Sequence, residues 1–348
     1  MTRLVELIFD GPESAHLAER EIPARLGPRE VLIETAITAV SPGTERANYL
    51  GEDPDAFSSG AWCAYPWRAG YSGVGRVVAI GSHVEEYSEG DRVVGMLWHA
   101  SHCVMSCDDE VRPFGPLAAE VSEDAAALIR LFGIAATPAE LIGIPSISTR
   151  VGVWGMGVIG NMAAQILKAV GYAVLAVDPD APRRAIASDC GLRHVGPDIE
   201  AALAAAGWSE VDVAVDAVGL AANTVRIGEY VSAGGLLVLM THWRSQPRVD
   251  AEPLVSAVFK KGLVVKGALE YATRTASPNW ATRQRKKWAW IAERIASGDL
   301  RSREVVGEVI SPDDLPAFYE RLVGGGSKGL TTLVDWSSCL PAAANEEF

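Results

Sequence analysis

The stretch Val151-Gly-Val-Trp-Gly-Met-Gly-Val-Ile-Gly160 decides the fold of this chain. An apolar segment runs into glycines at the G-x-G-x-x-G spacing, and good helix formers follow from 161 to 170. This order predicts a strand, a tight turn and a helix whose N-terminal N–H groups bind a pyrophosphate. An ordinary strand-to-helix turn is the alternative. We expect the loop to bind a nucleotide through Gly155, Met156, Gly157, Val158, Ile159 and Gly160.

The next predicted strand ends in an acid. The apolar run 172–177 leads into Asp178, close to the spacing of about 20 residues at which such folds bind the adenosine ribose. A carboxylate accepts hydrogen bonds from ribose hydroxyls and repels a 2′-phosphate, so we expect NAD(H) rather than NADP(H). Pro179 follows, not the arginine that is typical of phosphate recognition. Arg183, on the next predicted helix, either flanks the adenine or lies on a solvated helix face.

Strands and helices alternate from residue 148 onward. Near-continuous apolar strands separated by helices are typical of a doubly wound parallel sheet. Short strands and turns dominate near the N-terminus and return after residue 302. We therefore predict an α/β protein in which a nucleotide-binding domain, residues 134–298, is inserted into a discontinuous β-rich domain, residues 1–133 and 299–348. The predicted parallel strands are 151–154, 173–177, 211–215, 235–240 and 263–267.

Composition excludes several classes of protein. A chain of 348 residues suits about two domains. The net charge of -13 argues against nucleic acid or an anionic membrane surface as a partner. We find no 18-residue apolar run and no export signal, so the expected location is the cytoplasm. The 5 cysteines are scattered without a C-x-x-C pair, which implies no disulfide framework.

The order of motifs resembles the medium-chain dehydrogenase/reductase (MDR) superfamily, which includes zinc alcohol dehydrogenases and zinc-free quinone reductases. The segments that carry the resemblance are 30–34, 43–45, 70–75, 90–93 and the glycine loop. The resemblance implies a GroES-like catalytic domain, an NAD(P)-binding Rossmann domain and an active site in the cleft between them. It also implies a homodimer that pairs through the edge strand near 263–267.

The metal positions of the superfamily are altered. The zinc-dependent members carry a cysteine two positions before Thr44, where this chain has Pro42. Their His-Glu pair is Tyr71-Ser72 here, and their third ligand aligns near Gly133. A catalytic zinc needs three protein ligands, so we expect no metal.

The four closely spaced cysteines of the superfamily's structural zinc are also missing, since only Cys103 and Cys107 are present. Together with His99 and His102, these two cysteines suggest a different metal-binding cluster. Strand alternation places His102 on the face opposite His99 and Cys103, which favours partly buried His and Cys over a metal site.

The resemblance implies further cofactor contacts. Val218 lies in the segment that runs under the ribose and nicotinamide, and Thr241 should end the next strand near the nicotinamide. Thr137 occupies a position where the superfamily often places a threonine against the ring.

Hydride transfer to a carbonyl leaves charge on oxygen, and without zinc a side chain must supply the proton. We identify three candidates: Tyr71, Thr44 and His102. Alternatively, Tyr71 fills the space of the missing metal, Thr44 stabilises a turn and His102 is structural.

We therefore expect a zinc-independent, NAD(H)-dependent oxidoreductase of a secondary alcohol and its ketone. The segments 41–45 and 70–75 also look like the branch of bacteriochlorophyllide hydroxyethyl dehydrogenases. Trp62, Trp67, Trp98 and Trp243 suggest an aromatic-lined pocket for a sugar, a cyclitol or a polycyclic intermediate. One alternative is an NAD(P)H-dependent reductase of activated C=C bonds. The other is a dinucleotide-binding module without catalysis.

Overall fold

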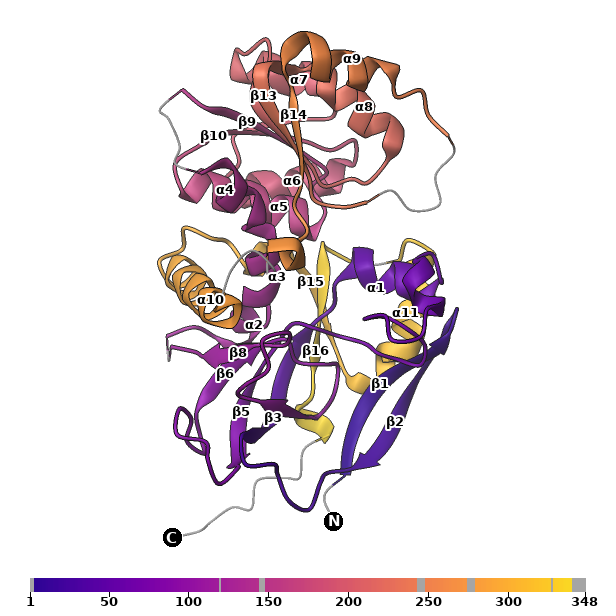
Figure 1. The fold of residues 1–348 in the computed structure, drawn as a ribbon, viewed down its shortest axis with the longest axis vertical. Coiled ribbons are helices and arrows are strands. Elements are labelled where there is room, and N and C mark those ends of the chain that lie inside the picture. The colour runs from indigo at the N-terminus through magenta and orange to yellow at the C-terminus, as the bar shows by residue number, and fades with distance from the viewer. Residues whose placement is uncertain are drawn as a thin grey trace. The chain divides into compact units, whose positions relative to one another are not determined.

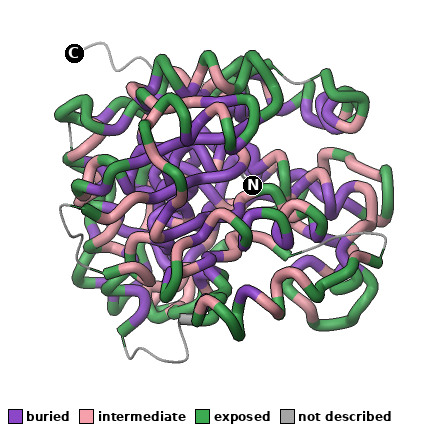
Figure 2. The backbone as a smooth tube through the Cα atoms, turned by 90° about the horizontal axis from the view of Figure 1, so that it is seen from above, coloured by how far each residue is buried: buried purple, intermediate pink, exposed green. Residues whose placement is uncertain are grey.

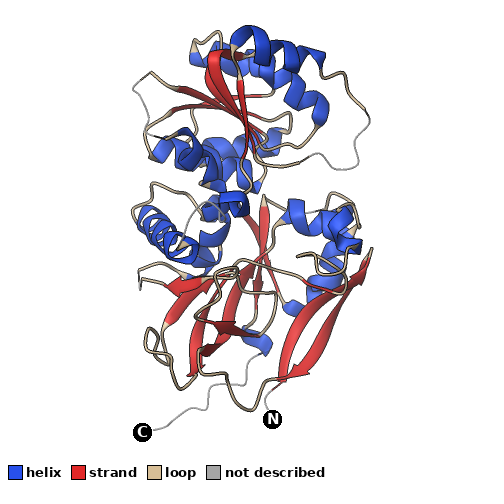
Figure 3. Cartoon of the chain, in the orientation of Figure 1, coloured by secondary structure: helices blue, strands red, loops and turns tan. Residues whose placement is uncertain are grey.

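The computed structural model describes residues 3–118, 120–143, 148–242, 248–273, 279–326 and 328–339. The chain forms two compact units, each described here by itself (Figure 3). The first unit contains Met1–Arg130, Ala281–Ala292 and Val306–Phe348, and the second contains Leu131–Trp280 and Glu293–Val305.

These bounds differ from the predicted 1–133, 134–298 and 299–348 mainly around the long helix α10 (Trp280–Ala296). Its segment Ala281–Ala292 belongs to the first unit. Ala281 N–H donates to Glu110 Oε2 at 2.9 Å, and Arg285 Nε donates to Phe114 O at 2.8 Å. Contacts that distant in sequence carry no local pattern, so the sequence could not assign this helix.

The second unit is built on a 6-stranded parallel sheet in the order β11-β10-β9-β12-β13-β14. The strand order reverses between β9 and β12, which makes a doubly wound sheet with its switch point beside β9. The strands are β9 (Arg150–Trp154), β10 (Ala173–Val177), β11 (His194–Gly196), β12 (Val211–Asp216), β13 (Val231–Leu239) and β14 (Val264–Gly267).

Helices cover both faces of this sheet (Figure 1). One face packs against α4 (Thr137–Ile142), α5 (Val158–Ala169) and α6 (Ala181–Asp189). The other packs against α7 (Ile199–Ala206), α8 (Ala221–Glu229) and α9 (Glu252–Lys261). Burial on both faces explains why the strands read as continuous apolar runs. The doubly wound α/β fold is confirmed, although β11, α7 and α9 were not predicted.

The first unit contains a 7-stranded sheet in the order β15-β16-β3-β5-β6-β8, with β7 paired to β3, and a 3-stranded sheet β2-β1-β4. Its strands are β1 (Arg3–Gly11), β2 (Ser14–Glu21), β3 (Glu30–Ala39), β4 (Trp67–Arg68), β5 (Gly73–Ile80), β6 (Arg92–Gly95), β7 (His102–Ser106), β8 (Phe114–Pro116), β15 (Val306–Ile310) and β16 (Thr331–Asp335). The β-rich character predicted for both ends of the chain is confirmed.

Helix α1 (Pro42–Tyr49) begins directly after β3, with a proline in its first turn, where the missing N–H costs no hydrogen bond. It packs against α11 (Leu315–Val323), which brings a late segment of the chain onto an early one. The aromatic core beneath contains Phe9 and Tyr319, whose ring centroids are 4.9 Å apart. This packing fixes the position of the first turn of α1.

The remaining helical segments are α2 (Glu123–Ala127), α3 (Ile129–Ala135), η1 (Pro54–Phe57), η2 (Glu270–Thr273), η3 (Arg303–Val305), η4 (Pro312–Asp314) and η5 (Ser337–Cys339). The stretch Glu123–Ile142 is long and apolar enough to cross a membrane by length and composition, contrary to the expectation that no such run exists. Its most apolar window is 72% buried, which is typical of a core helix. In Figure 2 the buried segments, in purple, run through the interior, and the exposed ones, in green, form the outer turns.

Candidate functional site

The glycine loop between β9 and α5 has the geometry of a phosphate-binding turn. Gly155 adopts a φ of +88°, which permits the turn after β9. A Cβ at Gly160 would lie 1.8 Å from Gly155 O, whereas a Cβ at Gly157 would meet nothing within 4 Å. The missing side chain at Gly160 therefore lets α5 pack closely against Gly155. The missing side chain at Gly157 leaves open the space beside this residue. Because no side chain caps α5 at Gly157, its first N–H groups stay available to an anion.

The carboxylate of Asp178 stabilises this loop by accepting backbone hydrogen bonds. Its Oδ2 accepts the Met156 N–H at 2.7 Å, and its Oδ1 accepts the Asp180 N–H at 2.8 Å. Asp178 is only 2% exposed, and Arg183 Nη1 lies 3.7 Å from Oδ2. Each carboxylate oxygen keeps a lone pair for a ribose hydroxyl. Asp178 thus stabilises the conformation of the predicted loop. The sequence alone indicated only its role in binding the ribose.

Val218 and Thr241 lie in the loops after β12 and β13, at the same carboxyl edge of the sheet. A Cβ at Gly155 would lie 2.9 Å from Val218 Cγ2, and one at Gly219 would lie 2.8 Å from Thr241 Cγ2. Parallel strands bring these three loops together, and this edge is where such sheets bind ligands. Thr137 is different, because it is fully buried in α4 and its hydroxyl donates to Ile134 O at 2.8 Å.

The first unit contains a hydroxyl cluster, which we define as Ser41, Thr44 and Tyr71. The side-chain hydroxyls of Ser41 and Thr44, at the start of α1, lie close enough to the phenol of Tyr71 to influence its pKa. Tyr71 and Thr44 are partly exposed, and Ser41 is buried. Burial, together with the negative charge of Glu45, raises the pKa of Tyr71 to about 12, against the lowering effects of both hydroxyls and Arg130. The phenol is therefore protonated at neutral pH.

A second set of buried side chains meets at Glu45, the residue that follows Thr44 in α1. Glu45 Oε1 accepts the Ser41 N–H at 2.9 Å, and Glu45 Oε2 accepts a short hydrogen bond from the Tyr319 hydroxyl. His99 Nε2 lies 3.2 Å from Glu45 Oε2, while its Nδ1 lies 2.7 Å from Thr38 Oγ1. Burial beside Glu45 raises the pKa of Tyr319 well above its ordinary value. From the sequence, His99 was expected to be a partly buried histidine rather than a metal ligand, and no local pattern indicated its pairing with Glu45.

His102 does not join these groups in the described contacts. It lies in β7 opposite Glu34, and its Nδ1 is 3.1 Å from Ser101 Oγ. Burial lowers the pKa of His102, which favours the neutral ring. Its neighbour Cys103 is fully buried, with Sγ 3.8 Å from Thr35 Oγ1. These surroundings do not favour His102 as the proton donor.

The residues at the zinc positions do not fit a catalytic zinc. Pro42 offers no donor atom, and the hydroxyl of Ser72 donates to Ala127 O at 2.6 Å. A phenol with a pKa of about 12, as at Tyr71, is a poor anionic ligand. Within the described ranges, no three His, Cys, Asp or Glu side chains are grouped to hold a metal ion.

Of the four tryptophans expected around a pocket, the three in the described part of the chain have different surroundings. Trp67 is 5% exposed and packs in the aromatic core, so its predicted place in a pocket wall is wrong. Trp62 packs edge-on against it and is 56% exposed. Trp98 is sandwiched between the guanidinium groups of Arg68 and Arg112, each 3.9 Å from the ring centroid. Trp243 lies outside the described residues.

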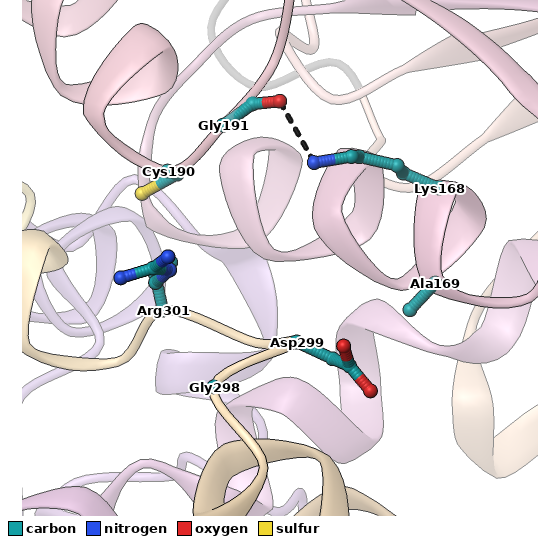
Figure 4. Close-up of a pocket in the computed structure, with 7 residues that line it drawn as sticks. All are labelled: Lys168, Ala169, Cys190, Gly191, Gly298, Asp299 and Arg301. Carbon is teal, nitrogen blue, oxygen red and sulfur yellow. Dashed lines mark hydrogen bonds between the residues drawn. The ribbon is translucent and has the colours of Figure 1, made fainter.

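A cavity of about 410 Å³ lies in the second unit, and its lining contains none of the predicted site residues. Among its lining residues, Lys168 donates to Gly191 O at 2.8 Å (Figure 4). The lining residues are Lys168, Ala169, Cys190, Gly191, Gly298, Asp299 and Arg301. We do not assign the cofactor to this cavity, because the open N-terminus of α5 lies at the glycine loop.

Comparison with known proteins agrees with both units. Residues 27–142 match the alcohol dehydrogenase GroES-like domain, and residues 158–283 match the zinc-binding dehydrogenase family. A curated relative, 2-dehydro-3-deoxy-L-galactonate 5-dehydrogenase from Pseudoalteromonas atlantica, is 24% identical over 187 residues, which cover 53% of this chain. The match spans 50% of that relative's length.

Solved structures share the whole fold. The 2R,3R-butanediol dehydrogenase of Bacillus subtilis has a TM-score of 0.76 at 19% identity, covering 95% of this chain and 99% of that one. A short chain alcohol dehydrogenase of Escherichia coli CFT073, complexed with NADH, has a TM-score of 0.76 at 18% identity, covering 96% of this chain and 100% of that one. At such identities the likeness shows the fold alone. With both domain families matched in order along the chain, the protein belongs to the medium-chain dehydrogenase/reductase superfamily.

Proposed function

We propose that this protein is a zinc-independent, NAD(H)-dependent oxidoreductase that interconverts a secondary alcohol and its ketone. The observation that carries the proposal is the hydroxyl cluster, because it groups a phenol with the hydroxyls of Ser41 and Thr44 at the position of a missing metal ligand. A Lewis acid and a proton donor have the same catalytic role, which is to stabilise the negative charge that develops on the substrate oxygen.

The proposed chemistry divides between the two units. A bound nicotinamide would supply or accept the hydride at the substrate carbon. In the direction of reduction, the Tyr71 hydroxyl donates its proton to the carbonyl oxygen, and in oxidation the phenolate takes that proton back. The hydroxyls of Thr44 and Ser41 favour the phenolate that forms when Tyr71 gives up its proton.

The choice of NAD(H) over NADP(H) rests on Asp178. Its negative charge, at the mouth of the loop, disfavours a 2′-phosphate. Arg183 is 53% exposed beside it and is the group that would favour the phosphate instead. Similar structures have been solved with NADH and with NADP, so the choice depends on Asp178.

The substrate that we propose is a small hydroxylated molecule, such as a sugar or cyclitol, or a polycyclic intermediate. The curated relative named for a sugar-acid substrate is consistent with the first class. Of the aromatic residues near the N-terminal loops, Trp62 and Phe57 are exposed enough to contact a ligand. Trp62 is the better candidate, because a large exposed ring can stack on a sugar face.

We further propose a cytoplasmic homodimer, with no nucleic-acid or membrane partner. The supporting feature is strand β14, an edge of the parallel sheet that is exposed along its whole length. Val264 and Val265 on the strand are 45% and 39% exposed, and Phe259 on α9 is 88% exposed. An apolar sheet edge of this kind is stabilised by pairing with a second copy.

Rapid mixing of the protein with NADH and separate panels of ketones, enones and quinones tests the reaction class. We expect NADH absorbance to fall with a ketone. Oxidation with enones or quinones alone would identify a reductase of activated C=C bonds. Binding of NADH without oxidation by any acceptor would identify a non-catalytic module.

A further inference from the structure

The side chain of Asp216 is built into the carboxyl edge of the parallel sheet, at the end of β12. Its Oδ1 accepts the Val218 N–H at 2.9 Å, and its Oδ2 accepts the Thr224 hydroxyl at 2.5 Å. Asp216 is 2% exposed, and Thr224, near the start of α8, is fully buried. Both side-chain oxygens are therefore used inside the protein, and they connect the loop after β12 to the helix that follows it.

The loop after β12, residues 217–219, packs against the neighbouring loops on both sides. A Cβ added at Gly155, in the glycine loop, would lie 2.9 Å from Val218 Cγ2. A Cβ added at Gly219 would lie 2.8 Å from Thr241 Cγ2, in the loop after β13. Contacts this close tie the position of each loop to that of its neighbours. Val218 is nevertheless 39% exposed, so part of its side chain is open to a ligand.

Asp178 and Asp216 lie on opposite sides of the glycine loop. Asp178 directly follows β10 on one side of β9, and Asp216 ends β12 on the other. Each accepts the backbone N–H two residues further along the chain, so the two turns have similar local geometry. A dinucleotide has two nucleoside halves joined at the pyrophosphate and binds across such a switch point. With the adenosine ribose at Asp178, the loops after β12 and β13 remain for the nicotinamide half.

We propose that Asp216 is a positioning residue for the nicotinamide half of the cofactor site. By accepting the Val218 N–H and the Thr224 hydroxyl, it fixes the loop 217–219 in the conformation that binds this half. The inference rests on the proposed function, to which it adds separate supports for the two halves of the cofactor. Without Asp216 the loop has to be ordered when the cofactor binds, and that ordering lowers the affinity.

Binding of NADH and of ADP to the wild type and to Asp216→Ala tests the proposal without a substrate. ADP contains the adenosine half and the diphosphate but no nicotinamide. We expect Asp216→Ala to weaken NADH binding by about tenfold, because two donors lose their acceptor, and to change ADP binding by less than about twofold. Fluorescence titration measures the first dissociation constant, and calorimetry measures the second. Equal losses for both nucleotides would overturn the proposal, as would unchanged NADH binding in the folded variant.

Two further variants separate positioning from general stability. Asp216→Asn should retain most of the NADH affinity, because an amide oxygen can accept the Val218 N–H and an amide N–H can donate to the Thr224 hydroxyl. Asp212→Ala is the matched control, since Asp212 Oδ2 accepts the Arg150 N–H at 2.7 Å near the other end of the same strand. It should leave both dissociation constants unchanged. A selective loss of NADH affinity in Asp212→Ala would contradict a specific role for Asp216.

Amide hydrogen exchange of the protein without nucleotide provides an independent readout. In Asp216→Ala we expect the loop 217–219 to exchange faster, while the glycine loop keeps its protection. Loss of protection in both loops would contradict separate supports. If Asp216→Ala does not fold, Thr224→Val should weaken NADH binding selectively by about threefold, and no change would overturn the proposal. A wild type that does not bind NADH would refute the cofactor itself, whereas NADH binding without ketone reduction would refute only the proposed reaction.

Discussion

Glu45 and His99 are 54 residues apart in the sequence, yet Glu45 Oε2 and His99 Nε2 lie 3.2 Å apart with both side chains fully buried. The contact joins the first turn of α1 to the segment before β7. Glu45 also accepts hydrogen bonds from the Ser41 N–H and the Tyr319 hydroxyl, so one buried side chain joins three segments of the first unit.

Tyr71→Phe removes the proposed proton donor and keeps the ring that fills the space. We expect the rate of ketone reduction to fall by about 10²-fold or more, because general acid catalysis contributes that much. NADH affinity, followed by fluorescence, should not change. Tyr230→Phe, which removes a phenol hydroxyl that bonds Glu200 outside the hydroxyl cluster, is the matched control. A fully active Tyr71→Phe would return Tyr71 to a packing role.

The pH dependence of reduction follows from the raised pKa of Tyr71, about 12. The active form is the phenol, which persists at all pH values below that pKa. We expect the rate of hydride transfer in the NADH complex to be flat between about pH 7 and 10, where an ordinary phenol already begins to ionise. Rapid-mixing kinetics across this range provide the test, and a decline that begins below about pH 9 would contradict it.

Asp178→Asn keeps an acceptor for the Met156 N–H but removes the charge that faces the ribose. We expect NADH binding to weaken and the preference for NADH over NADPH to narrow by about tenfold. Asp180→Asn, which changes a charge at the cap of α6, is the matched control. Equal dissociation constants for wild type and Asp178→Asn with both cofactors would show that Asp178 does not select between them.

Two glycines of the loop predict different defects. A Cβ at Gly157 meets nothing within 4 Å, so Gly157→Ala should fold normally and lose NADH affinity, because the methyl group occupies the pyrophosphate side. A Cβ at Gly160 would collide with Gly155 O, so Gly160→Ala should also lower the free energy of unfolding by about 1–3 kcal/mol. Thermal unfolding and NADH titration separate the two. Equal stability losses in both variants would contradict this division of roles.

The sequence predicted what short-range patterns encode. The predicted strands 151–154, 173–177, 211–215 and 263–267 match β9, β10, β12 and β14 to within one residue at each end. Glycine spacing and apolar runs are local, and they determine a doubly wound sheet. Strand β11 is only three residues long and α7 is rich in alanine, so neither has a strong periodic pattern.

Contacts across long sequence separations could not be predicted. His99 meets Glu45, and Tyr319 meets Glu45 across 274 residues. The proline and tyrosine at the metal positions were visible in the sequence, but the contacts of Glu45 with His99 and Tyr319 were not. The misplaced Trp67 has the same origin, since its burial depends on Phe9 and Trp62.

The central claim is that Tyr71, and not a zinc ion, acts on the substrate oxygen. Its most direct test is the zinc content of the purified protein, measured by plasma mass spectrometry and paired with ketone reduction before and after chelation. We predict far less than one zinc per chain and a rate that chelation leaves unchanged. About one zinc per chain that resists dialysis, with activity lost on its removal, would contradict the account.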